Sequence, residues 1–179
     1  MILDLRRLPI LETERLRLDP LTPEDIEDLF PIMGEAEVMA FWDVPEADDP
    51  DIAAQVVRTR VEEMQGGRAV HWTIRRLDDG QVVGSSNLTD IDRRHRRAEL
   101  GVVLRRDVWG REYALETLST VVAFAAASGL RKLAARTQLG NRRAEAPLLQ
   151  LGFEEEGLLR GHLVRDGERR DCRLFGLLL

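Results

Sequence analysis

The chain of 179 residues is poor in cysteine and lysine and has no long hydrophobic run. Because Cys172 is the only cysteine, no internal disulfide framework can form, and we expect a reducing, intracellular setting and a buried structural thiol. No apolar stretch approaches the roughly 18 residues of a membrane span, and the N-terminus lacks the apolar core of a signal peptide. We therefore expect a cytoplasmic protein without a membrane partner.

Several signatures of catalysis and ligand binding are also missing. The sequence contains no P-loop, no G-x-G-x-x-G fingerprint and no G-x-S-x-G elbow. Its three histidines, His71, His95 and His162, do not have the spacing of metal ligands, and no cysteine cluster accompanies them. We expect no metal site.

The composition is that of a globular protein with a substantial core. Hydrophobic residues make up 44% of the chain, and 26 basic residues against 32 acidic ones give a net charge of −6. The length predicts a single domain over residues 1–179. The acidic balance argues against a nucleic-acid partner, although residues 93–97 form one dense basic run. That run is interpreted either as a solvated loop or as an anion-docking patch beside a cleft.

Hydrophobic periodicity and turn signals predict strands and helices along the whole chain. Helices are expected to begin at Thr22-Pro23 and at Asp49-Pro50, and residues 41–49 are expected to be irregular. Strands are expected at 15–18, 69–77, 81–91, 100–104, 133–137, 153–164 and 168–178, and the other helices at 111–128 and from Asn141 to Gly152. This order predicts an α/β fold, with a mixed sheet flanked by helices.

The stretch from Glu99 to Ala127 is the most informative part of the sequence about function. A buried strand at 100–104 is followed by charges and a glycine turn, and then by apolar residues at helical spacing. A strand, a glycine turn and a helix start together form an anion cradle, because the helix start has spare N–H groups and a partial positive charge. An ordinary strand-to-helix connection would have the same pattern.

Four segments together resemble the GNAT superfamily of acyl-CoA-dependent N-acetyltransferases, and within it the ribosomal-protein N-terminal acetyltransferase branch. The segments are LETERLRLDPLTPEDIEDL, AELGVVL, DVWGREYALETL and LLQLGFEEEGLLR, the last followed by a G-x-x-x-D spacing. The resemblance covers nearly the whole chain. It implies a mostly antiparallel central sheet that is splayed between the strands at 100–104 and 133–137.

The resemblance also implies a site for acetyl-CoA as co-substrate. The pantetheine arm would lie in the splay and bond to the backbone near Val102 and Leu104. The pyrophosphate would lie over a loop matching the pattern Q/R-x-x-G-x-G/A, and Asn141 would cap a helix and contact the cofactor. The loop residues are Trp109, Gly110, Arg111, Glu112, Tyr113 and Ala114.

Three positions depart from the family pattern, all along the expected cofactor groove. Glu112 stands in place of the central glycine, where a carboxylate would repel a pyrophosphate and a Cβ would crowd the backbone. Ala144 replaces the serine often proposed to reprotonate the departing thiolate. Pro147 lies inside the predicted helix and would make it either start late or kink.

The candidates for acid–base chemistry are few. Acetyl transfer to an amine needs a base for the amine proton and an acid for the thiolate. Glu99, at the start of the central strand, is the candidate base, although it could equally be an edge carboxylate. Tyr113 is the candidate acid, although it could simply pack in the loop. His71 and His162 are alternatives if they reach the cleft.

These observations leave three functional hypotheses. The first is an acetyl-CoA-dependent N-acetyltransferase acting on a peptide N-terminus or a small amine, as a monomer or homodimer. The second is a catalytically weakened binding module of the same fold, and the third is an acyltransferase with another acyl donor. The core around the groove is expected to include Leu100, Val102, Leu104, Leu115, Leu118, Val122, Leu133 and Phe153.

Overall fold

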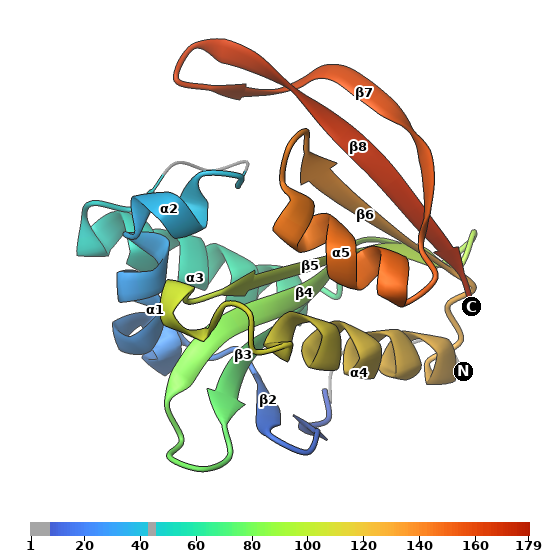
Figure 1. The fold of residues 1–179 in the computed structure, drawn as a ribbon. Helices are drawn as coiled ribbons and strands as arrows, with labels where there is room; N and C mark the ends of the chain where they lie inside the picture. The colour runs from blue at the N-terminus through green and yellow to red at the C-terminus, as the bar shows by residue number, and fades with distance from the viewer. Residues whose placement is uncertain (1–7, 43–45) are drawn as a thin grey trace.

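The computed structural model describes residues 8–42 and 46–179, and these residues form one mixed sheet flanked by helices (Figure 1). The sheet has eight strands in the order β1-β2-β3-β4-β5-β6-β8-β7. All neighbouring strands are antiparallel except β5 and β6. The strands are β1 (Leu11–Glu12), β2 (Leu16–Pro20), β3 (Val70–Arg76), β4 (Val82–Asp92), β5 (Arg97–Leu104), β6 (Lys132–Gln138), β7 (Glu154–Arg165) and β8 (Glu168–Leu178).

The helices cover both faces of the sheet. Figure 1 shows α4 and α5 on one side, while α1, α2 and α3 are grouped on the other. None of the helices in the described ranges is long and apolar enough to cross a membrane. The helical elements are η1 (Pro23–Asp25), α1 (Ile26–Met33), α2 (Ala36–Met39), α3 (Pro50–Gln65), η2 (Arg106–Val108), α4 (Tyr113–Ala127) and α5 (Arg142–Gln150).

Local signals explain where the longer helices begin. Asp49 caps α3 by accepting a hydrogen bond from the Asp51 N–H at 2.8 Å, and Asn141 caps α5 by accepting from the Ala144 N–H at 3.3 Å. Two short elements, β1 and α2, were not expected from the sequence. The irregular stretch predicted at 41–49 lies partly outside the described residues.

The central splay is present as expected. Strands β5 and β6 pair only from Arg97 to Glu99 with Lys132 to Ala134. Beyond that point β5 stays paired with β4 and β6 stays paired with β8. The two parallel strands therefore separate within the sheet, and α5 and α3 border the gap.

Most of the predicted core is confirmed, with two corrections. Leu100, Leu104, Leu118, Leu133 and Phe153 are buried, but Val102, Leu115 and Val122 are only partly buried. In α4 the fully buried stripe runs through Leu118, Val121 and Ala125, so the inward register passes through Val121 rather than Val122.

The second correction concerns α3. Its hydrophobic spacing predicts that Ile52, Val56, Val57 and Val61 face inward, but Ile52 is 51% exposed, whereas Val57 is buried and Val56 and Val61 are partly buried. Ile52 lies at the rim of a cavity described below. The Ile52 side chain therefore adds apolar surface to the rim of the cavity and does not belong to the core.

Pro147 lies within α5, which begins at Arg142. The expectation of a late helix start is therefore wrong. A proline has no N–H, so Pro147 cannot donate to the Arg143 carbonyl, its partner four residues earlier in an α-helix. The helix continues past the proline, because the Leu151 N–H donates to the Pro147 carbonyl at 3.1 Å.

Candidate functional site

Two adjoining hollows open at the splay. The larger, called the cavity, measures about 680 Å³ and lies between α3, the central strands and β7. The smaller, called the groove, measures about 340 Å³ and lies between β5, the turn that precedes α4, and α5. The residues that line both are Phe41, Trp42, Val102, Asn141 and Ala144. A ligand that extends from one hollow into the other would therefore pass Val102 and Ala144.

The backbone of β5 faces the gap at Val102 and Leu104. The Arg105 N–H donates to the Val83 carbonyl at 2.8 Å, which makes the odd-numbered residues of β5 the hydrogen-bonded partners of β4. The even-numbered residues present their N–H and C=O groups to the other side. The Leu104 carbonyl accepts from Trp109 Nε1 at 3.0 Å. The N–H and C=O of Val102 and the N–H of Leu104 remain directed at the groove.

The turn before α4 has two residues with positive φ. Gly110 has φ 77°, and a Cβ there would meet no atom within 4 Å. Glu112 has φ 63°, in the left-handed region that favours glycine, at a cost of roughly 1 kcal/mol. Glu112 occupies the N-cap position of α4. The first N–H groups of α4 have no partner within the helix, so this end of the groove is a favourable site for an anion.

The predicted loop residues differ in where they lie. Trp109, Gly110, Glu112, Tyr113 and Ala114 all line the groove. Arg111 is exposed and lines neither hollow. The basic run at 93–97 is likewise exposed in the turn between β4 and β5 and lines neither hollow, which favours its interpretation as a solvated loop.

The charged side chains that line the groove differ in their partners. Glu37 forms an ion pair with Arg106 at 2.9 Å. The guanidinium carbon of Arg143 lies 3.5 Å from the centre of the Trp109 ring. This stacked arginine could not be recognised from the sequence, because Arg143 and Trp109 are 34 positions apart along the chain.

In the cavity, three residues from three strands form a connected polar group. Arg136 Nε lies 2.7 and 2.9 Å from the two carboxylate oxygens of Glu99, and Arg136 Nη1 lies 2.6 Å from His162 Nε2. Since a guanidinium only donates, His162 accepts through Nε2 and carries its ring proton on Nδ1. Sequence reasoning proposed Glu99 and considered His162, but missed Arg136.

His71 lies deeper, in the wall of the cavity beside α3. It is 5% exposed, and burial, reinforced by the nearby positive charge of Arg60, lowers its pKa to about 3. His71 is therefore uncharged at neutral pH. Its Nε2 lies 3.4 Å from a Glu63 carboxylate oxygen, which is a contact with a neutral imidazole rather than an ion pair.

Gly101 allows an amide to cover the floor of the cavity. A Cβ at Gly101 would lie 2.8 Å from Asn87 Oδ1, so a larger residue at 101 would require the Asn87 side chain to move. Gly101, Asn87 and His71 are register partners across β5, β4 and β3 and therefore share one face of the sheet. This face presents a row of polar groups to the cavity.

The two proposed acid–base residues lie in different hollows. Glu99 lines the cavity, whereas Tyr113 lines the groove and packs its ring 4.8 Å from the Arg15 guanidinium. The sequence offered no sign of this separation, because Glu99 and Tyr113 belong to one continuous motif. Asn141 and Ala144 lie where the hollows meet, so the position of the missing serine is at the centre of the site.

The comparisons with known proteins agree with this architecture. The family model described as Acetyltransferase (GNAT) domain matches residues 15–154. The protein named Uncharacterized N-acetyltransferase YoaA of Bacillus subtilis (strain 168) is 29% identical over 171 residues, which are 95% of this chain and 97% of that protein.

Two solved structures share the fold at low sequence identity. RimL ribosomal L7/L12 alpha-N-protein acetyltransferase in complex with Coenzyme A superposes with a TM-score of 0.87 at 16% identity, covering 96% of this chain and 98% of that one. Spermidine N-acetyltransferase from Vibrio cholerae in complex with CoA and spermine has a TM-score of 0.82 at 17% identity, covering 93% and 96%.

Proposed function

The chain belongs to the acetyltransferase (GNAT) family, and from that premise we propose that it transfers the acetyl group of acetyl-CoA to the nitrogen of an amine. The observation that carries this proposal is the pair of hollows that meet at Val102, where β5 turns unpaired backbone groups toward the splay. A donor in the groove and an acceptor in the cavity would meet there.

The groove suits the donor. Because β6 no longer pairs with β5 at Val102, the N–H and C=O of Val102 are available to the pantetheine amides. They can form hydrogen bonds with these amides as they would with a neighbouring strand. The turn at Gly110 and the first N–H groups of α4 suit the pyrophosphate. Both features point to one elongated ligand, with its thioester at the junction beside Ala144.

The cavity suits the amine. The acceptor must be neutral to attack, and Glu99 can take its proton directly or through a water molecule. The amine nitrogen then forms a bond to the thioester carbonyl carbon, and a backbone N–H of β5 stabilises the oxyanion. The attacking nitrogen loses its second proton to water, collapse breaks the carbon–sulfur bond, and the CoA thiolate takes a proton from water or from Tyr113, since Ala144 has no hydroxyl.

The acceptor class follows from the same cavity. Its volume of about 680 Å³ is sufficient for a small amine or for the first residues of a peptide. Proteins of similar structure are named for both kinds of acceptor. One is a spermidine N-acetyltransferase, and another is an acetyltransferase of a ribosomal protein. We propose an amine of one of these two classes.

Thermal unfolding with and without acetyl-CoA tests the donor site. At about 100 times the dissociation constant, the ligand adds about 2.7 kcal/mol to the free energy of unfolding. Mass spectrometry of an amine and peptide panel incubated with acetyl-CoA tests the transfer. Stabilisation without any acetylated product would support a binding module. If the protein shows neither stabilisation by acetyl-CoA nor an acetylated product, the proposal is overturned.

A further inference from the structure

The groove is lined by one basic residue, the exposed Arg143, that forms no ion pair with the described part of the chain. Among its described lining residues, Arg143 is the only arginine, lysine or histidine, and Glu37 and Glu112 are the only acids. Glu37 is paired with Arg106. Within residues 8–42 and 46–179, no carboxylate lies within ion-pair distance of Arg143, and its stacking on Trp109 is its only side-chain contact of this kind.

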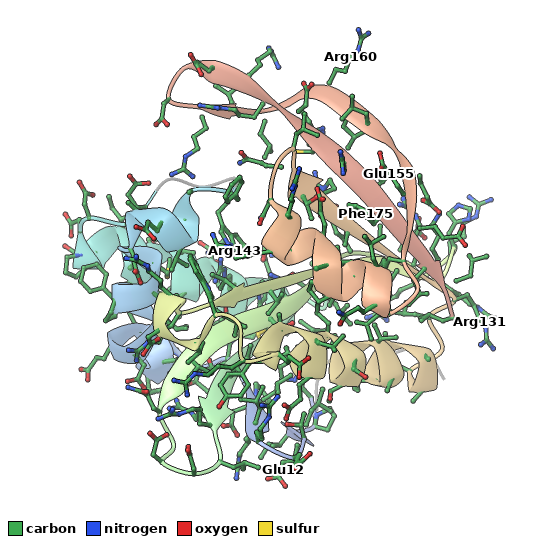
Figure 2. All side chains as sticks on the ribbon, in the orientation of Figure 1. Glu12, Arg131, Arg143, Glu155, Arg160 and Phe175 are labelled. Atoms are coloured by element: carbon green, nitrogen blue, oxygen red, sulfur yellow. The ribbon has the colours of Figure 1, made fainter. Side chains whose placement is uncertain are left out.

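The position of Arg143 has an electrostatic cost. The residue follows Arg142 in the first turn of α5, where the helix dipole favours negative rather than positive side chains. Figure 2 labels Arg143 at this end of α5, on the side that faces η2 and α2. An anion bound in the groove would offset the unfavourable charge.

The stacking geometry leaves the binding edge of the arginine available. A guanidinium that lies on an aromatic face has its N–H groups in the plane parallel to the ring, so they point past the ring rather than into it. The planar fork can then donate two parallel hydrogen bonds to phosphate oxygens. Trp109 is itself held by the hydrogen bond from its Nε1 to the Leu104 carbonyl. The arginine is therefore presented by a fixed platform.

We propose that Arg143, supported by Trp109, binds the pyrophosphate of the acyl-CoA donor from the α5 side of the groove. This inference rests on the proposed function. Arg143 supplies a positive charge to the groove lining, where Glu112 introduces a negative one. The donor site is thus formed by the backbone of the turn on one side and by a side chain on the other.

Calorimetric titration of two variants with three ligands tests the proposal. Arg143→Ala is compared with Arg142→Ala, a neighbouring exposed arginine that lines neither hollow. We expect Arg143→Ala to weaken acetyl-CoA binding roughly 10- to 100-fold, as for the loss of hydrogen bonds to a charged group. We expect Arg142→Ala to change it less than about twofold.

The ligand series identifies the phosphate. Acetyl-3′-dephospho-CoA keeps the pyrophosphate, so Arg143→Ala should weaken its binding by the same factor. S-acetylpantetheine lacks nucleotide phosphates, so its binding should not change. A loss seen with acetyl-CoA but not with the dephospho ligand would overturn the assignment to the pyrophosphate, and an equal loss with S-acetylpantetheine would show a merely structural effect.

A third variant separates charge from the planar fork. Arg143→Lys keeps the positive charge but lacks the fork, so we expect it to recover only part of the affinity that Arg143→Ala loses. Full recovery would contradict the part assigned to the fork. If the unaltered protein binds acetyl-CoA and Arg143→Ala binds it equally well, only this inference fails, whereas absence of binding by the unaltered protein refutes the proposed function itself.

Discussion

Arg136 holds Glu99 by both carboxylate oxygens, at 2.7 and 2.9 Å from one guanidinium nitrogen. The two residues belong to β5 and β6, and they meet just where these strands begin to separate. The carboxylate proposed to receive the amine proton is thus already fixed in position. Its remaining lone pairs can still accept a proton from an amine or a water molecule in the cavity.

Glu99→Gln tests this role. The substitution removes the base but keeps the size of the side chain, and we expect acetyl transfer to fall by roughly a hundredfold or more. The loss should be greatest at low pH, where most of the amine is protonated. The assay measures initial rates from pH 6 to pH 9, beside Glu62→Gln as an exposed α3 control outside both hollows. Equal rates in all three proteins would place the chemistry elsewhere.

Arg136→Gln tests the partner. The arginine holds both oxygens of the Glu99 carboxylate, so its removal leaves the proposed base without a fixed position. We expect kcat for acetyl transfer to fall by roughly tenfold with little change in the KM of the amine, measured as initial rates over an amine series. An unchanged kcat would show that Arg136 does not position Glu99.

Glu112→Gly should tighten the binding of acetyl-CoA. The change removes a negative charge from the groove and relieves the left-handed strain of a non-glycine residue at φ 63°. We expect stability to rise by roughly 0.5–1 kcal/mol in denaturant unfolding. Glu112→Asn, which tolerates this backbone conformation but also lacks the charge, separates the two effects in calorimetry. Equal or weaker binding by both variants would refute the argument about Glu112.

Ala144→Ser should raise turnover. Ala144 lies where the two hollows meet, so a hydroxyl there would be placed to return a proton to the CoA thiolate. Steady-state rates of thiol release provide the measurement. Ala146→Ser is the matched control, because Ala146 is on the same helix and lines the groove but not the cavity. An increase in both variants, or in neither, would show that thiolate protonation does not limit the rate.

His71 should make stability depend on pH. Its folded-state pKa of about 3 lies below the ordinary value of 6.5, so between these values only the unfolded chain binds the proton. The contribution of neutral His71 to the free energy of unfolding is complete above pH 6.5. It is lost as the pH falls toward 3, by up to about 1.4 kcal/mol for each pH unit. His71→Gln has no such titration. Urea unfolding of both proteins at pH 7.5, 6.0 and 5.0 should therefore show a steeper loss in the unaltered protein, and parallel curves would contradict a buried neutral His71.

The acetyltransferase family was predicted from the sequence because its evidence is local. The motif around Trp109 and Gly110 combines a strand, a turn and a helix start within about twenty residues, and each is specified by its own side chains. The hairpin turns around Gly80 and Gly167 are equally local, and both glycines have positive φ. Elements of this kind are selected by backbone propensity and hydrophobic period, which neighbouring residues in the chain determine.

The sequence by itself determined the order of the major elements, the splayed sheet through its resemblance to a family, and Glu99 as a candidate base. Only the tertiary structure decided the partners of each functional group. Arg136 reaches Glu99, and His162 reaches Arg136, because β6 and β7 bring them to the same side of the splay, and Arg143 reaches Trp109 because α5 packs beside the turn. These contacts depend on strand register and side-chain direction between distant segments. No local pattern encodes them, since a shift of one residue in register would turn each side chain to the opposite face.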